Sequence, residues 1–177
     1  MKSRARLIAV EGVSGPAVLA AAKALRTDCH KGSGISEWDA SGIFGELAAS
    51  YDGGAPSARV LLLLYATDLA FRLRWEIQPA LAEGRVVIAA PYVATAVAFG
   101  RAAGLRGSWL SNLFGFAPPA AESHRIAPPR QAMPGHEGFV EFGCARAAGI
   151  RRGLSGDRLM DRAAAFLKRH DVHRGAR

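Results

Sequence analysis

The chain has 177 residues and a mass of 18.7 kDa, a size that fits one domain with a single sizeable core. Half of the residues are hydrophobic and 21% are charged, a mix that excludes wholesale disorder, collagen-like repeats and a disulfide-stapled miniprotein. Lysine and arginine number 23 against 15 acidic residues, which gives a formal net charge of +8. Only four of the basic residues are lysines, a bias typical of GC-rich genomes, so the charge alone is a weak guide to function.

The cysteines and the apolar runs indicate a cytoplasmic protein. Cys29 and Cys144 stand far apart without the spacing of a disulfide framework, so we expect two reduced thiols. The longest apolar runs, residues 60–71 and 86–100, are interrupted by Asp68 and by Pro91. Neither run reaches the roughly 20 apolar residues that a membrane span requires, so we expect no membrane partner.

The first 25 residues predict half of a βαβ unit. Residues 6–10 form a short apolar run that is typical of a buried strand, and residues 11–15 (EGVSG) predict a tight turn. Pro16 suits the first turn of a helix because its missing N–H has no partner there, and residues 17–25 continue with strong helix formers.

The remaining elements alternate between helices and short strands. Ser57 is a candidate helix cap, Pro79 is expected to kink its helix or to start a second one, and Gly84 is expected to end it. The predicted helices are 41–50, 57–83, 92–103, 105–116 and 155–170. The predicted strands are 35–38, 85–90 and, with an unusually polar composition, 122–127; residues 131–138 are expected to form a loop. Because the 85–90 strand is apolar on both faces, it indicates a parallel sheet covered by helices on each side.

Three segments in chain order resemble the thymidylate kinase family. They are residues 7–15 (LIAVEGVSG), 63–70 (LLYATDLA) and 84–99 (GRVVIAAPYVATAVAF), with IQPAL at 77–81 as a shorter fourth match. The resemblance spans about residues 7–105 and implies an α/β P-loop NTPase fold, a three-layer parallel sheet flanked by helices. It also implies a single domain over residues 1–177 and a homodimer, and we expect residues 171–177 to form a flexible basic tail.

The phosphate-binding loop departs from the family pattern. A P-loop supplies backbone N–H groups, a lysine for the β- and γ-phosphates and a hydroxyl for Mg²⁺. Here Val18 stands at the lysine position, Leu19 at the serine or threonine position and Ala17 at a glycine position. Ser14 replaces the family's aspartate, and Pro16 removes one N–H donor.

The second catalytic segment departs in the same way. The family's Asp-Arg pair before the conserved tyrosine is Ala90-Pro91 here, and the arginine of the 63–70 segment is Leu69. Phosphoryl transfer relies on electrostatic stabilisation and positioning, so these losses together predict loss of the reaction.

The positions that the resemblance assigns to the base are chemically conservative. Tyr65 stands where the family stacks an aromatic ring on thymine, Tyr92 is kept, and Thr95 and Phe99 replace a serine and a tyrosine. These rings indicate either a residual nucleotide pocket or packing of the interior. The residual nucleotide-binding residues that we predict are Gly12, Gly15, Tyr65, Asp68, Tyr92, Thr95 and Phe99.

We therefore expect a thymidylate-kinase-like protein that has lost phosphotransferase activity and acts as a binding, regulatory or assembly subunit. The surface of residues 57–83 is the expected interface for a second copy or a protein partner, and a nucleotide or nucleoside is a candidate ligand. We predict no catalytic residue, no metal site and no cofactor. One alternative is an active dTMP-type kinase with a non-standard loop, which would need ATP and Mg²⁺. Another is a basic nucleic-acid-associated protein, since arginines concentrate in the last third of the chain without a recognised nucleic-acid-binding module.

Overall fold

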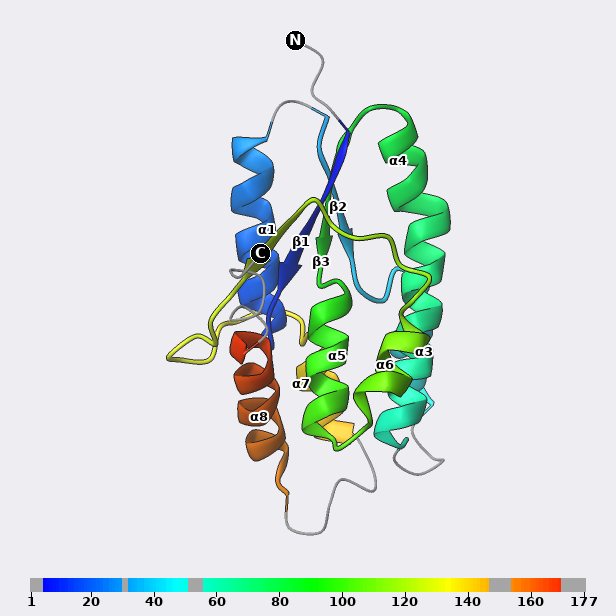
Figure 1. Cartoon of the computed structure of the whole chain (residues 1–177). Helices are drawn as coiled ribbons and strands as arrows, with labels where there is room; N and C mark the ends of the chain where they lie inside the picture. Colours follow the sequence, from blue (N-terminus) through cyan, green and yellow to red (C-terminus); the bar gives the residue numbers. More distant parts are fainter. Residues whose placement is uncertain (1–4, 30–31, 51–55, 147–153, 170–177) are drawn as a thin grey trace.

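The computed structural model describes residues 5–29, 32–50, 56–146 and 154–169, so the predicted tail at 171–177 lies outside the described residues. The described chain has four strands and eight α-helices, with one π-helical turn, η1, between α3 and α4; Figure 1 shows their arrangement. The strands are β1 (Arg6–Glu11), β2 (Gly34–Glu37), β3 (Val86–Ala90) and β4 (Glu122–Arg125). The helical elements are α1 (Gly15–Asp28), α2 (Ile43–Ala49), α3 (Ala58–Arg72), η1 (Leu73–Ile77), α4 (Gln78–Ala82), α5 (Val93–Ala102), α6 (Gly107–Leu113), α7 (Phe139–Arg146) and α8 (Gly156–Arg169).

The four strands form one parallel sheet in the order β2-β3-β1-β4. Leu7 pairs with Val87 between the two central strands, and Ile8 pairs with Glu122 of the edge strand. All four predicted strands are confirmed. The polar composition of β4 follows from its position, because an edge strand tolerates side chains that a central strand would have to bury.

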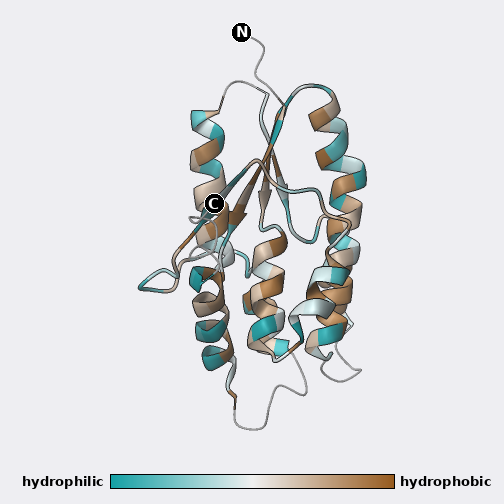
Figure 2. Ribbon diagram, in the orientation of Figure 1, coloured by the Kyte–Doolittle hydropathy of each residue, from teal (hydrophilic) through white to brown (hydrophobic). Residues whose placement is uncertain are grey.

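Helices cover both faces of the sheet, as predicted. On one face, Ile8, Val10 and Ile88 pack with Val18 and Ala22 of α1. On the other face, strand residues such as Leu7 and Val87 join a larger core to which α3, α5, α6, α7 and α8 contribute. Figure 2 shows hydrophobic residues along the strands and a largely hydrophilic outer side on α8. The observed architecture is the predicted three-layer α/β class.

The predicted helix over residues 57–83 is divided into α3, η1 and α4. The Ser57 side chain accepts a hydrogen bond from the Val60 N–H at 3.2 Å, which confirms the predicted cap. Pro79 lies in the first turn of α4, directly after the π-helical turn. Proline is tolerated in the first turn of a helix, because its missing N–H has no partner there. Gly84 has φ +81° and ends the segment as predicted.

The helix α7 follows the predicted loop and was not predicted from the sequence. It places Phe139, Val140 and Phe142 in the larger core. Among the described residues, no helix is long and apolar enough to cross a membrane.

Candidate functional site

The candidate site lies at the carboxyl ends of the parallel strands, around the loop between β1 and α1. In open α/β sheets, ligands bind at this edge. The backbone N–H of Gly12 donates to Thr95 Oγ1 at 3.1 Å, which joins the loop to α5. A Cβ on Gly12 would lie 2.7 Å from Val18 Cγ2, so the loop requires glycine at this position.

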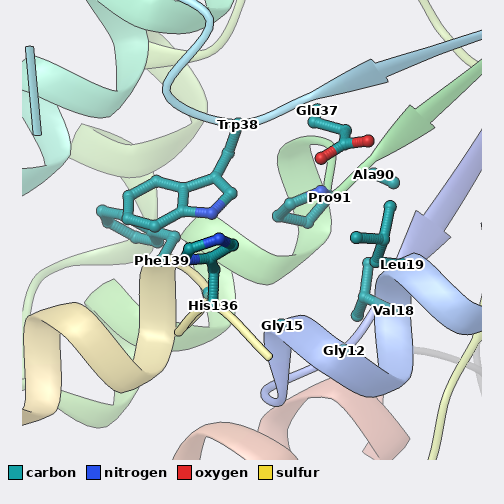
Figure 3. A pocket seen from close by; sticks show the side chains of 11 residues that line it. Gly12, Gly15, Val18, Leu19, Glu37, Trp38, Ala90, Pro91, His136 and Phe139 are labelled. Atoms are coloured by element: carbon teal, nitrogen blue, oxygen red, sulfur yellow. The ribbon is translucent and has the colours of Figure 1, made fainter. Parts of the chain in front are cut away.

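A cavity of about 60 Å³ lies against this loop (Figure 3). Val18 and Leu19 of α1 line one side, and Ala90 and Pro91 line another. The lining residues are Gly12, Gly15, Val18, Leu19, Glu37, Trp38, Ala90, Pro91, His136, Gly138 and Phe139. This described lining holds no lysine, arginine, serine or threonine, and its one carboxylate, Glu37, repels rather than attracts a phosphate.

The chain itself covers the loop with residues 136–141. Gly15 and Gly138 lie in backbone contact, because a Cβ on Gly15 would lie 2.3 Å from the Gly138 nitrogen and 2.8 Å from the His136 oxygen. The Glu141 carboxylate accepts hydrogen bonds through the same oxygen, Oε2, from the Gly15 N–H at 2.9 Å and from the Gly138 N–H at 2.6 Å. One N–H of the predicted phosphate-binding loop, that of Gly15, therefore already has a carboxylate acceptor within the chain.

The Glu11 carboxylate is buried and serves the start of α5. It accepts hydrogen bonds from the N–H groups of Tyr92 at 3.2 Å, Ala94 at 3.0 Å and Thr95 at 2.9 Å, and from Thr95 Oγ1 at 2.6 Å. A negative charge at a helix N-terminus is stabilised by the free N–H groups and the helix dipole. Glu11 thus holds α5 against the end of β1.

The predicted aromatic residues Tyr65 and Phe99 lie in the core. Both side chains are fully buried, and their rings lie 4.4 Å and 5.2 Å from that of Phe139 of α7. The Tyr65 hydroxyl donates to the Tyr92 carbonyl at 2.7 Å, and burial raises the pKa of Tyr65 well above its usual range. Neither ring lines the cavity at the loop. Their positions favour the packing interpretation.

Tyr92 lines a second and larger cavity of about 410 Å³ on the α5 side of β1 and β4. Glu11 and Arg125 also line it, together with the segment from Phe114 to Ala120. The Tyr92 hydroxyl donates to the Pro118 carbonyl at 2.8 Å, and burial raises the pKa of Tyr92 to about 12. The phenol therefore stays protonated at neutral pH and ties the start of α5 to this segment.

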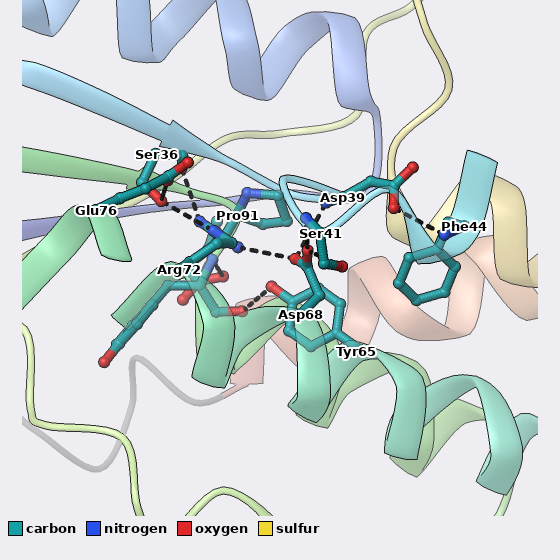
Figure 4. A network of polar contacts seen from close by, with 11 residues as sticks. Ser36, Asp39, Ser41, Phe44, Tyr65, Asp68, Arg72, Glu76 and Pro91 are labelled. Carbon is teal, nitrogen blue, oxygen red and sulfur yellow. Dashed lines mark hydrogen bonds and ion pairs between the residues drawn. The ribbon is translucent and has the colours of Figure 1, made fainter. Parts of the chain in front are cut away.

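Asp68 belongs to a buried polar network on α3 (Figure 4). Its carboxylate accepts hydrogen bonds at 3.0 Å from the N–H groups of Asp39 and Ser41, and at 2.9 Å from the Ser41 hydroxyl. Burial raises the pKa of the Asp68 carboxyl above its usual range, although the Ser41 hydrogen bonds and the charge of Arg72 oppose this shift. Asp68 thereby fixes the loop between β2 and α2.

Arg72 is the centre of this network and is fully buried. Its Nε donates to Ser36 Oγ at 3.0 Å, and its Nη2 donates to the carbonyls of Ser36 at 2.7 Å and Pro91 at 2.9 Å. Its Nη1 lies 3.9 Å from Asp68 Oδ2, and Ser36 Oγ in turn donates to Glu76 Oε2 at 2.6 Å. The guanidinium thus joins α3 to the carboxyl ends of β2 and β3.

The structure brings only part of the predicted site together. Gly12, Gly15 and Thr95 meet at the loop, whereas Tyr65, Phe99 and Asp68 lie among core side chains and buried partners. Sequence reasoning missed Arg72 and Glu141. For Glu141 a signal existed, because a glutamate three residues after a helix-capping position is a capping-box pattern. Among the described residues, no cluster of histidine, cysteine, aspartate or glutamate is arranged to hold a metal ion.

Comparison with known proteins supports the fold. No protein-family model and no curated protein matches this sequence. Among solved structures, the crystal structure of thymidylate kinase from Ehrlichia chaffeensis is similar, with a TM-score of 0.59. The match covers 70% of this chain and 75% of that chain at 15% sequence identity. The chain therefore has a thymidylate-kinase-like P-loop fold, as the sequence resemblance implied.

Proposed function

We propose that this chain is a thymidylate-kinase-like protein without phosphotransferase activity, which serves as a binding, regulatory or assembly subunit. The observation that carries the proposal is the apolar lining of the cavity at the loop by Val18, Leu19, Ala90 and Pro91. Kinases of this fold class depend on a lysine and on metal-held phosphates, because transfer is driven by electrostatic stabilisation and positioning. These hydrocarbon side chains supply neither a positive charge nor a ligand for the metal.

The residues present do not fit ATP with Mg²⁺. Val18 has no charge to neutralise a phosphate, and Leu19 has no oxygen for the metal. The N–H of Gly15 already donates to Glu141, and residues 136–138 lie directly over the loop. The cavity at the loop is also small, about 60 Å³.

The outer surface of α3 and η1 supports the assembly part of the proposal. Four large hydrophobic side chains at nearly helical spacing are exposed there: Val60, Leu63, Phe71 and Trp75. The occupant that we propose is a second copy of this chain, because one such face on each copy gives a self-complementary, two-fold contact. A Leu63→Arg variant is expected to shift the mass in solution from dimer to monomer, whereas Ala20→Arg on exposed α1 is not. A monomeric wild-type protein would contradict this part.

The proposed loss of activity is tested by thermal unfolding with ATP and with dTMP, each with and without Mg²⁺, beside an active thymidylate kinase. A ligand that binds the native state raises its stability by RT ln(1 + [L]/Kd), about 2.7 kcal/mol at 100 times Kd. We expect the active enzyme to shift with ATP and this chain not to shift. Stabilisation by Mg-ATP, or phosphorylation of dTMP by the purified protein, would overturn the proposal in favour of an active kinase with a non-standard loop.

A further inference from the structure

The N-termini of two helices converge on one carboxylate oxygen. The N–H of Gly15 is at the start of α1, and the N–H of Gly138 directly precedes α7. Both donate to Glu141 Oε2, at 2.9 Å and 2.6 Å. Glu141 is close in sequence to Gly138 but lies 126 positions from Gly15. The hydrogen bond to Gly138 is a local capping box, whereas the bond to Gly15 joins distant parts of the chain.

The surroundings of this oxygen are those of an anion site. Free N–H groups at a helix N-terminus attract a negative charge, and two such termini meet here. The Gly15–Gly138 contact brings the two backbones so close that neither position has space for a Cβ. A third cavity, of about 330 Å³, opens beside Glu141 and Ser14 and is lined by Arg130 and Gln131 among others. Glu141 therefore borders a cavity large enough for a small solute, and Gly15 and Gly138 line the separate cavity at the loop.

The same helix is anchored on the other side of the site by its aromatic rings. The Phe139 ring lies 4.4 Å from Tyr65 and 5.8 Å from Phe44, and Phe142 lies 5.8 Å from Trp38. These contacts hold α7 in place independently of the carboxylate. Removal of the Glu141 carboxylate is therefore expected to vacate the position of its Oε2 while α7 stays in place.

We infer that Glu141 is a tethered anion, which fills an oxyanion site formed by the amides of Gly15 and Gly138. The site takes a small oxyanion such as formate or acetate when the Glu141 side chain is absent. In the wild-type protein the oxyanion site is closed to free anions, because the Glu141 carboxylate belongs to the same chain and already occupies it. This inference goes beyond the absence of phosphoryl transfer, since it assigns an occupant and a ligand class to the loop.

Chemical rescue of a Glu141→Ala variant tests the inference. The variant is expected to unfold roughly 5–10 °C below wild type, since two donors lose a charged acceptor. Formate at about five times its Kd is then expected to raise that midpoint by about 2–4 °C more than sodium chloride of equal ionic strength. Wild type and Glu46→Ala, which removes an exposed first-turn carboxylate of α2, are expected to show no such excess. An equal formate effect in all three proteins would overturn the inference.

A second measurement decides the question even if Glu141→Ala does not fold. Glu141→Gln keeps the length of the side chain and removes its charge. The amide protons of Gly15 and Gly138 are expected to resonate downfield in the wild-type NMR spectrum and to move upfield in Glu141→Gln, because charge-assisted hydrogen bonds are stronger than neutral ones. Unchanged shifts at both glycines would refute the tethered anion. They would leave the proposed loss of kinase activity untouched, since that proposal rests on nucleotide binding and turnover.

Discussion

Replacing Arg72 with methionine tests whether its guanidinium holds the strand ends together. Methionine matches the length of the arginine stem and fills the buried space without a charge. The change removes three hydrogen bonds, two to Ser36 and one to the Pro91 carbonyl. It also leaves the Asp68 carboxylate without the cation that lies 3.9 Å away. Asp68 keeps its hydrogen bonds to Asp39 and Ser41, so its position is retained while its charge is uncompensated.

The expected loss in the free energy of unfolding is large. Breaking a buried ion pair by removing one partner costs about 3–5 kcal/mol, because the other charge remains buried and unpaired. A domain is stable by only about 5–15 kcal/mol in total, so this loss is a large fraction. Arg26→Met, which removes an exposed arginine from the last turn of α1, is expected to cost under about 1 kcal/mol. The two variants remove the same chemical group from buried and exposed environments.

Urea unfolding followed by circular dichroism measures both variants. A fall in the transition midpoint with an unchanged slope would assign the loss to stability rather than to a change in compactness. If Arg72→Met costs no more than Arg26→Met, the network does not hold β2 and β3 to α3, and the reasoning fails.

The pH dependence of Arg72→Met adds a second test. The pKa of Asp68 is raised from its ordinary value of 3.8, so its protonation stabilises the fold at low pH. That stabilisation is lost as the pH rises through the pKa of the folded state. Because the Arg72 charge lowers the pKa of Asp68, its removal raises this pKa further. The deficit of Arg72→Met is therefore expected to be smaller at pH 4.5 than at pH 8, and a deficit that grows on acidification would contradict this assignment.

Three further changes test the helix cap, the packing of α7 and the half-buried thiol of Cys144. Ser57→Ala removes the cap of α3 and is expected to cost about 1 kcal/mol in urea unfolding. Gly143→Ala would place a Cβ 2.7 Å from the Phe99 ring, and this overpacking is expected to lower the free energy of unfolding by about 1–3 kcal/mol. Burial raises the pKa of the Cys144 thiol to about 12. In a Cys29→Ser variant at pH 8, mass spectrometry should therefore find alkylation roughly 10³-fold slower in the folded than in the unfolded protein.

The sheet could be predicted because its evidence is local in the sequence. The apolar runs of β1 and β3, the turn after Glu11 and the cap at Ser57 all depend on adjacent residues. The site depends instead on pairs far apart in the chain. Arg72 meets Ser36 across 36 positions and Gly15 meets Glu141 across 126, and no pattern in a single sequence predicts either contact. The helix α7 has a capping-box glutamate, but Gly143 inside a mixed FVEFGCAR segment weakens its helical pattern.

The apolar substitutions and the internal carboxylate both act against anion binding at the loop between β1 and α1. Free N–H groups at a phosphate-binding loop, together with its lysine, form a site that favours an anion. In this chain Val18 and Leu19 replace the charge and the hydroxyl, while Glu141 accepts the hydrogen bond of Gly15. Without Glu141 the Gly15 N–H would lose its acceptor within the chain, and without Val18 a lysine at that position would supply a positive charge beside the loop. Together the two changes remove the charge that would attract a phosphate and engage an N–H that would bind it, so restoring lysine at position 18 alone is not expected to restore nucleotide binding.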